Sequence, residues 1–136
     1  AVPLVVSDDR DTSVNVCRAI FSITDEGYVI TGGNIQQGGI VSMARLNYDV
    51  VLSSIKILPK IVDLEKATGA TIYSCMSRYY TLGLLAQDEM KEVEKYIKNI
   101  PFSLTYSGGE ICPVLNKKGE LINKYHNMTV VIMVFE

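Results

Sequence analysis

Hydrophobic residues in the first third of the chain recur with the spacing of β-strands. Residues 14–23 alternate, and both faces of that run are largely apolar, so the pattern predicts an interior strand. The Asp-Glu-Gly sequence at residues 25–27 predicts a tight hairpin turn into residues 28–30. Residues 3–4 enter another apolar run, and residues 40–46 form one more. The first third therefore predicts four antiparallel strands.

The hydrophobic period changes to that of a helix at Asn47. Asn47 is a good N-cap, and Asp49 suits the positive end of a first helical turn. Apolar residues then follow helical spacing from residue 50 to residue 64. Pro59 lacks a backbone donor, so it predicts a kink or a break one residue before it, and Gly69 is expected as the residue that ends the segment.

The second half of the chain mixes strands with one more helix. Residues 87–99 predict a helix whose buried face carries Met90, Val93 and Ile97. The remaining predictions are a short strand at 71–75, an irregular loop at 76–85, a strand at 102–106, a hairpin over 114–122 and a central strand at 128–135.

This order of elements predicts an α+β fold, with a mainly antiparallel, mixed β-sheet and two helices packed on one face. The length of 136 residues fits one domain with one core, which we expect to span residues 1–136. The chain starts without methionine, so we interpret it as a domain from a longer protein, although N-terminal processing leaves the same start.

Composition excludes several functional classes. Hydrophobic residues make up 48% and charged residues 21% of the chain, which is typical of a globular protein. The net charge of -2 leaves no basic excess for nucleic acid or acidic lipid, and the apolar runs are too short to span a membrane. The three cysteines show no paired spacing, so a reducing cytoplasm is the expected location.

Three polar clusters each lie where an apolar run begins or ends. They are Ser74 to Arg78, the Ser-Gly-Gly-Glu turn at residues 107–110, and the pair His126 and Asn127. Glycines allow a turn with positive φ and a close approach to a ligand. We therefore expect the three clusters to form one shared site.

Arg78 and Glu110 are the charged candidates within these clusters. The Arg78 guanidinium suits a carboxylate ligand held by two hydrogen bonds, but an internal salt bridge to Glu110 or a solvated position remains open. Glu110 suits a ligand amine, or it accepts bonds from the backbone of its own glycine turn.

Cys75 raises the alternative of a nucleophilic enzyme. A reactive thiol needs an activating base or a positive neighbour, which Arg78 and His126 are able to supply. No cysteine-hydrolase motif surrounds Cys75, and a buried inert thiol is favoured over catalysis. His126 is the lone histidine, and no metal-ligand spacing or phosphate-binding glycine motif occurs, so we expect no metal and no cofactor.

The polar clusters, in this order, resemble the C-terminal domain of the FIST family, the F-box and intracellular signal transduction proteins. The resemblance covers the whole chain and rests on three stretches. These are residues 72–78 (Ile-Tyr-Ser-Cys-Met-Ser-Arg), residues 101–111, which contain Phe102 and the Gly-Gly-Glu-Ile turn, and residues 126–129 (His-Asn-Met-Thr). Arg18 is similar to an arginine in the opening segment of the family. Two features depart from the family pattern: the usual turn has a bulkier residue than Gly108, and Tyr79-Tyr80 replaces small residues.

The resemblance implies a sensory domain that binds small ligands, with amino acids proposed, and that is not an enzyme. It implies a FIST N-terminal domain and attached signalling modules as partners. In this interpretation Arg78 holds a carboxylate and Glu110 an amine. Other expected contacts are the Gly108-Gly109 backbone, with His126 and Asn127 in support, and the neighbouring Cys75 and Ser77. A structural or dimerisation module, including a homodimer, is a third hypothesis. It requires the polar clusters to bond only to each other, with Arg78, Glu110 and His126 closed to solvent and no pocket beside them.

Overall fold

The structure is a computed structural model that describes residues 1–7, 14–97 and 99–136. Its strands are β1 (Leu4–Ser7), β2 (Asn15–Arg18), β3 (Ile20–Ile23), β4 (Val29–Thr31), β5 (Val41–Met43), β6 (Gly69–Cys75), β7 (Phe102–Ser107), β8 (Glu110–Leu115), β9 (Leu121–His126) and β10 (Val130–Phe135). The helices are α1 (Tyr48–Ile55), α2 (Leu58–Ile61), α3 (Met76–Leu82) and α4 (Gln87–Tyr96), with a 3₁₀ turn, η1, at Gly83–Leu85.

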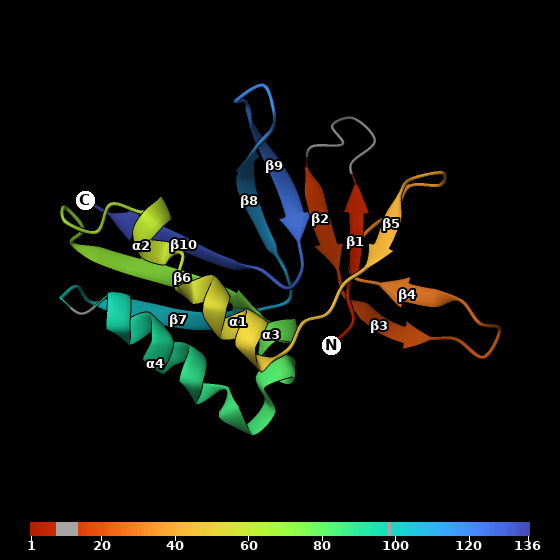
Figure 1. The fold of residues 1–136 in the computed structure, drawn as a ribbon, viewed down its shortest axis with the longest axis horizontal. Helices are drawn as coiled ribbons and strands as arrows, with labels where there is room; N and C mark the ends of the chain where they lie inside the picture. The colour runs from red at the N-terminus through yellow and green to blue at the C-terminus, as the bar shows by residue number, and fades with distance from the viewer. Residues whose placement is uncertain (8–13, 98) are drawn as a thin grey trace.

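A three-stranded sheet covered by helices forms one side of the molecule (Figure 1). β6 is its middle strand, antiparallel to β10 and parallel to β7. Ile72 of β6 packs with Ile55, Leu58, Val93 and Ile97, which come from the helical segments. The helices therefore cover the face of β6 that carries Ile72. The residues on either side of Ile72 point to the opposite face, because side chains alternate along a strand.

The N-terminal strands form the other side of the molecule. β1 lies between β2 and β5 in an antiparallel sheet, and β3 and β4 form a separate hairpin. The β8–β9 hairpin lies between the two sides (Figure 1). Val114 of β8 packs on the small core of Val6, Val14 and Val16, so this hairpin is anchored to the N-terminal sheet.

The α+β prediction is confirmed, with strands in antiparallel and mixed sheets and helices against one of them. The strands belong to several small sheets rather than one. The hairpin turns at residues 25–27 and 116–119 join paired strands as predicted. Asn47 caps α1 by accepting a bond from Val50 N, and α1 ends before Pro59, which lies in the first turn of α2.

The predicted interior strand at residues 14–23 is wrong. The chain breaks into β2 and β3 at Ala19, whose N–H donates to the Asn127 side chain instead of to a neighbouring strand. Every residue of β3 is exposed. Alternating apolar residues on both faces are therefore not enough to place a strand inside a sheet, since they also occur on a hairpin whose faces are open.

The predicted loop at residues 76–85 is also wrong, because α3 and η1 occupy it. α3 buries Arg78 and Leu82, four residues apart on one helical face. The helical periodicity is not recognised from apolar residues alone, because one of the two buried positions is an arginine. Gly69 begins β6 and does not end a helix, because α2 finishes at Ile61.

Two further predictions need correction. Residues 128–135 contain β10, which lies at the edge of its sheet, while β6 holds the centre. In α4, Val93 and the following Ile97 are buried as predicted, but Met90 is 38% exposed. Glu89, completely buried, takes the inner position that an apolar pattern assigns to a hydrophobic residue.

Candidate functional site

Arg78 and Glu89 form an ion pair inside the helix-covered core. Arg78 Nη2 lies 2.7 Å from Glu89 Oε1, and the side chains are 2% and 0% exposed. Arg78 Nη2 also donates to the carbonyl of Val51 and to the hydroxyl of Ser54. α3 therefore directs the guanidinium into the space between α1 and α4.

The Glu89 carboxylate is the acceptor that organises the surrounding hydroxyls. Ser74 Oγ and Tyr106 Oη both donate to it, at 3.0 Å each to Oε2. Burial, together with the negative charge of Glu89, raises the pKa of Tyr106, so its hydroxyl remains a donor. Ser74 comes from β6 and Tyr106 from β7, so the cluster ties both strands to the helices.

This geometry differs from two of the three interpretations of Arg78 made from the sequence, the salt bridge to Glu110 and the solvated position. The internal partner is Glu89 and not Glu110, and the side chain is 2% exposed, so it is not solvated. Arg78 Nε and Nη2 both face Glu89, so a ligand carboxylate that takes the same two groups has to displace Glu89. Breaking a buried pair leaves an uncompensated charge, so this geometry does not support the role of carboxylate clamp.

Glu110 is 5% exposed and already has two hydroxyl donors. Ser107 Oγ donates to one of its carboxylate oxygens and Thr129 Oγ1 to the other, each at 2.5 Å. The carboxylate therefore fixes the start of β8 to the end of β7 and to the turn before β10. The bonds come from side chains, whereas the sequence reading offered backbone N–H donors of the glycine turn.

His126 lies opposite Glu110 in the β8–β9 register and is 5% exposed. Its Nε2 is buried and has no hydrogen-bond partner. Burial lowers the pKa of His126, and the positive charges of Arg18 and Lys124 lower it further. The imidazole therefore resists protonation in the folded protein.

Asn127 joins the two sides of the molecule. Its Oδ1 accepts from Ala19 N, its backbone N–H donates to Cys17 O, and its Nδ2 donates to the Tyr125 hydroxyl. It is 1% exposed, so these bonds fix the β9–β10 turn against the point where β2 gives way to β3.

Sequence reasoning missed the part that Tyr125 plays in the diglycine turn. Gly109 has φ of +138°, and a Cβ at that position meets Tyr125 Oη at 2.3 Å. Tyr125 Oη also donates to Gly108 O, and its ring lies 5.8 Å from the Arg18 guanidinium carbon. Glycine is needed at 109 because the tyrosine ring occupies the side-chain position.

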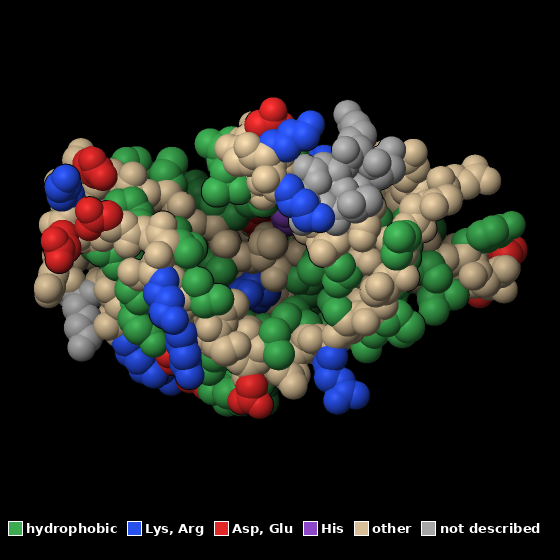
Figure 2. Space-filling model, turned by 45° about the horizontal axis from the view of Figure 1, so that its top comes forward, with side chains coloured by type: hydrophobic (Ala, Val, Ile, Leu, Met, Phe, Trp, Pro, Cys, Tyr) green, Lys and Arg blue, Asp and Glu red, His purple; other side chains and the backbone are tan. Residues whose placement is uncertain are grey.

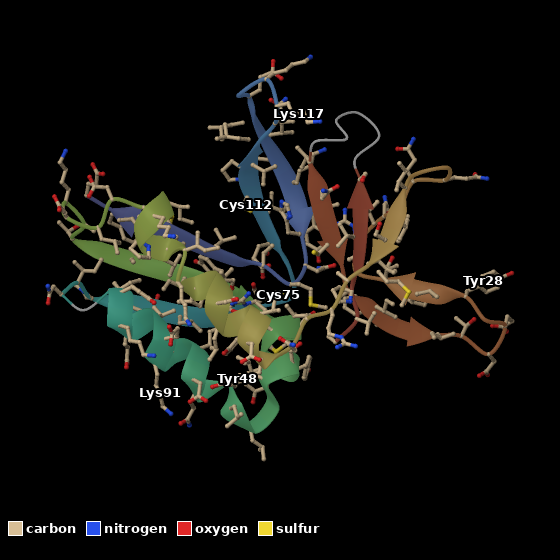
Figure 3. The ribbon with its side chains drawn as sticks, viewed as in Figure 1. Tyr28, Tyr48, Cys75, Lys91, Cys112 and Lys117 are labelled. Carbon is tan, nitrogen blue, oxygen red and sulfur yellow. The ribbon has the colours of Figure 1, made fainter. Side chains whose placement is uncertain are left out.

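A pocket of about 600 Å³ opens where β6 passes into α3. Three of the predicted site residues line it, namely Cys75, Ser77 and Gly108. Figure 3 shows Cys75 in the middle of the molecule, at the end of β6 closest to the N-terminal strands. The rest of the lining is Ala1, Ala19, Ile20, Phe21, Met76, Tyr80, Thr81 and Met128. We call this set the α3 pocket.

The α3 pocket is walled by apolar groups and hydroxyls. Ser77, Tyr80 and Thr81 supply the hydroxyls, and no Asp, Glu, Lys or Arg residue belongs to the lining. Met128 lines it from a backbone with φ of +64°, an uncommon conformation for a bulky residue. Arg78 and Glu110 are absent from the lining, so the expectation that they face a common hollow is not met by this pocket.

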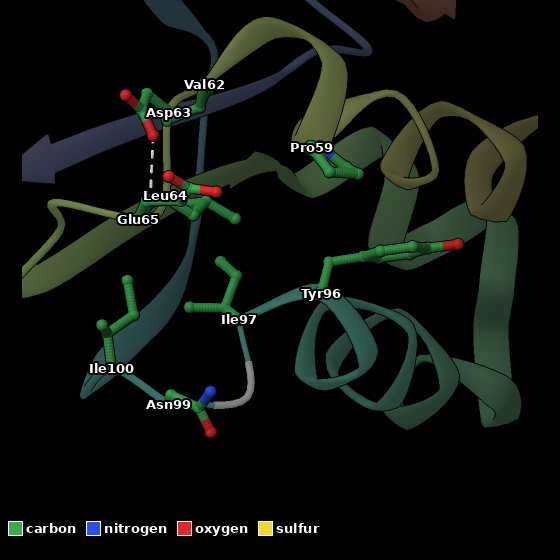
Figure 4. A pocket seen from close by; sticks show the side chains of 9 residues that line it. All are labelled: Pro59, Val62, Asp63, Leu64, Glu65, Tyr96, Ile97, Asn99 and Ile100. Atoms are coloured by element: carbon green, nitrogen blue, oxygen red, sulfur yellow. Dashed lines mark hydrogen bonds between the residues drawn. The ribbon is translucent and has the colours of Figure 1, made fainter.

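A second pocket, of about 530 Å³, lies away from all the predicted site residues (Figure 4). It is bounded by the end of α4, with Tyr96 and Ile97, and by the segment from Val62 to Glu65. The Asp63 side chain accepts a bond from Glu65 N within that segment. No residue of the three polar clusters reaches it.

Within the described part of the chain, no group of three or more His, Cys, Asp and Glu residues is placed to hold a metal ion. Cys75 is 1% exposed, and among the described hydrogen bonds none joins its sulfur to His126, whose Nε2 has no partner. Cys17, Cys75 and Cys112 are free thiols. No described helix is both long and apolar enough to span a membrane.

A family model, described as the FIST C domain, matches residues 1–113. The chain belongs to the FIST C domain family. This family is associated with signal transduction. The FIST C match includes the Cys75–Arg78 and Gly108–Glu110 segments, and it ends before His126 and Asn127. Searches of curated proteins and of solved structures gave no match.

Proposed function

We propose that this FIST C domain is a sensory module that binds a small molecule in the α3 pocket. One observation carries the proposal: Cys75, Ser77 and Gly108 line the same cavity. Gly108 lies more than thirty positions after the other two in the sequence, so the fold brings them together. Polar groups among apolar walls are typical of small-molecule sites. The association of the family with signal transduction supports a sensory role over a purely structural one.

The lining favours a ligand that is mostly uncharged at the point of contact. The hydroxyls of Ser77 and Tyr80 supply donors and acceptors, and that of Thr81, which donates to Ser77 O, supplies an acceptor. Phe21 and Met128 supply apolar surface. An amino acid fits this proposal through its side chain and through hydroxyl contacts to its polar ends. The lining contains no charged side chain of the kind first expected from Arg78 and Glu110.

Arg78 and Glu110 support the pocket from outside it. Arg78 holds α3, which contributes Met76, Ser77 and Tyr80 to the lining, by its pair with Glu89. Glu110 holds the end of the Gly108 turn through Ser107. Their burial, together with that of His126, supports a structural role for these three residues, whereas a purely structural module also requires that there be no pocket.

Met128 offers a route from the pocket to the helices. Its side chain lines the α3 pocket and also packs on the buried cluster of Leu46, Val51 and Leu82. Val51 belongs to α1 and Leu82 to α3. A ligand that favours one position of Met128 therefore shifts the packing of both helices, and attached intracellular signalling modules or an N-terminal FIST domain receive that change.

We favour binding over catalysis at Cys75. A catalytic thiol needs access to substrate and a base within hydrogen-bond reach. Cys75 is 1% exposed, and no described hydrogen bond joins its sulfur to His126, whose Nε2 has no partner. For ligand binding, in contrast to catalysis, Cys75 needs no activating base, because a free cysteine acts there as a small hydrophobic residue.

The experiment that tests the proposal is NMR titration of the isotopically labelled chain with the twenty amino acids. We expect at least one to shift the backbone signals of residues 75–81 and 108 more than those of the second pocket around Tyr96. Shifts confined to the second pocket, or absent for every amino acid, contradict the amino-acid form of the proposal. A parallel titration with neutral alcohols of similar size separates that failure from failure of the pocket itself.

A further inference from the structure

Two aromatic rings line the α3 pocket, one from each side of the molecule. Phe21 comes from β3 and Tyr80 from α3. Phe21 is 62% exposed and Tyr80 is 75% exposed, so each ring keeps a large surface that the rest of the described chain does not cover. Figure 2 shows hydrophobic side chains along the end of the molecule that carries the β3–β4 hairpin. Both rings are therefore open to a ligand that enters the pocket.

Contacts outside the pocket orient these two rings. The Tyr79 ring lies 5.9 Å from the Tyr80 ring and 5.0 Å from the Tyr106 ring, both in T-shaped arrangements. Tyr106 belongs to β7, so this row of rings connects Tyr80 to the sheet. On the other side, Phe21 Cζ lies 3.0 Å from the position that a Cβ on Gly32 would take. A wall that is oriented before binding loses less conformational entropy when a ligand arrives.

The chemistry of the lining distinguishes an aromatic ligand from a saturated one. Aromatic rings gain from edge-to-face or offset contact with another ring, beyond the burial of apolar area. The sulfur of methionine also favours contact with a ring. Phe21 and Tyr80 supply rings to the pocket, and its thioethers come from Met76 and Met128. A saturated ring buries apolar area as well but receives neither contribution.

The polar groups of the pocket limit the rest of the ligand. No Asp, Glu, Lys or Arg lines the pocket, so a carboxylate or an ammonium group loses hydration there without a charged partner. Ser77 Oγ and Tyr80 Oη take part in none of the described hydrogen bonds, whereas Thr81 Oγ1 donates to Ser77 O. The lining therefore matches a neutral group that donates or accepts a hydrogen bond.

We propose that the α3 pocket is selective for a small uncharged aromatic compound with one neutral hydrogen-bonding group. The ring of the ligand contacts Phe21 and Tyr80, and its polar group bonds to Ser77. This inference rests on the proposed function and narrows its ligand class. The pocket volume of about 600 Å³ lies within the roughly 300–1,000 Å³ that is typical of small-molecule sites.

NMR titration of the labelled chain with benzyl alcohol and with cyclohexylmethanol tests the proposal, because these probes share a hydroxyl and differ in the ring. We expect benzyl alcohol to shift the backbone signals of residues 75–81 and to bind at least about threefold more tightly than cyclohexylmethanol. The hydrophobic effect alone favours the opposite order, since the saturated probe is the more apolar. Benzoate and benzylamine, which are charged at neutral pH, are expected to bind more weakly than benzyl alcohol.

Phe21→Leu and Tyr80→Leu each keep an apolar wall and remove one ring. We expect each variant to reduce the preference for benzyl alcohol over cyclohexylmethanol. Tyr28→Leu is the matched control, because Tyr28 is 69% exposed at the outer end of the same hairpin and does not line the pocket (Figure 3). Circular dichroism checks the folding of all three variants. The 75% exposure of Tyr80 keeps that variant informative if Phe21→Leu is destabilised.

The outcomes separate failure of the ligand class from failure of the pocket. Cyclohexylmethanol shifting the same residues with equal or higher affinity overturns the aromatic selectivity, and a charged probe that binds more tightly than benzyl alcohol overturns the neutral class. A preference for benzyl alcohol that both ring variants retain in full overturns the assignment to Phe21 and Tyr80. The absence of shifts in residues 75–81 with all four probes overturns the proposed function together with this inference.

Discussion

Arg78 Nη2 lies 2.7 Å from Glu89 Oε1, and neither side chain has more than 2% of its surface exposed. The arginine comes from α3 and the glutamate from α4, while Ser74 and Tyr106 connect the same carboxylate to the sheet. The relation matters for function because α3 carries part of the pocket lining. Any change that releases Arg78 is expected to loosen the wall of the pocket.

The first prediction concerns the stability of this pair. Glu89→Gln leaves the guanidinium of Arg78 buried without its counter-charge, so we expect a loss of about 3–5 kcal/mol in the free energy of unfolding. Chemical denaturation followed by circular dichroism measures it. Lys91→Ala is the matched control on the same helix, because Lys91 pairs with Asp88 at the surface, where its side chain is 64% exposed. Equal losses in the two variants contradict the assignment.

The second prediction concerns the diglycine turn. Gly109→Ala places a Cβ where Tyr125 Oη lies, at φ of +138°, so both a steric clash and backbone strain oppose it. We expect a loss of about 2–4 kcal/mol in stability. Gly119→Ala separates the two effects, because it has positive φ but open space around the new Cβ, and it costs about 1 kcal/mol.

Relief of that clash gives a sharper form of the same test. Tyr125→Ala removes the ring that the new methyl group meets, so the double variant with Gly109→Ala loses less stability than the sum of the two single variants. If the stability losses of the two single variants add up to that of the double variant, Tyr125 is not the reason that residue 109 has to be glycine.

The third prediction is a pH dependence from His126. Burial and the nearby positive charges of Arg18 and Lys124 lower its pKa in the folded state below the value of 6.5 that it has when unfolded. The unfolded chain therefore binds more protons between the two values, and stability falls as the pH drops below 6.5. The full contribution is present above that pH.

Denaturation at a series of pH values checks the effect, with His126→Gln as the comparison. The wild-type chain is expected to lose stability from about pH 7 to about pH 5.5, before most carboxylates titrate. The slope over this range should flatten in the variant. If both chains show the same slope, the proton is taken up by another group.

Much of the fold follows from local signals in the sequence. Asn47 predicts the start of α1 because its side chain satisfies a free backbone donor, and Pro59 predicts a break because it lacks one. The turn at residues 25–27 predicts its hairpin for the same local reason. Each of these features depends on groups within a few residues of one another, so the local sequence is enough to predict it.

The failures arise where long-range contacts decide the structure. α3 was hidden because its inner face carries Arg78, which is acceptable inside only where Glu89, eleven residues later, supplies a counter-charge. Chain order also gives no sign that β6, and not β10, takes the middle of its sheet. Both depend on partners that a periodic pattern does not identify.

The candidate site shows the same division. The sequence predicts one shared site from three polar clusters. Cys75, Ser77 and Gly108, from two of these clusters, line the α3 pocket, and the His126–Asn127 cluster does not. The roles of Arg78 and Glu110 were assigned from charge alone, and the structure gives each an internal partner. Charge predicts that a partner exists but does not indicate whether it is a ligand or another side chain.

The central claim is that the α3 pocket receives a small molecule, and Gly108 allows a direct test. A Cβ built at Gly108 meets nothing within 4 Å, and its φ lies outside the glycine-favoured range, so larger side chains enter open space without strain. We expect Gly108→Phe to fill part of the pocket while leaving the melting temperature of the free chain unchanged. Gly108→Ala, which adds a single methyl group, is the graded control.

The measurement is isothermal titration calorimetry of the wild type and both variants with the amino acid or alcohol that gives the largest NMR shifts. The account predicts binding to the wild type, nearly unchanged binding to Gly108→Ala, and loss of binding to Gly108→Phe. Equal affinity for all three chains places the ligand elsewhere on the molecule and contradicts the account.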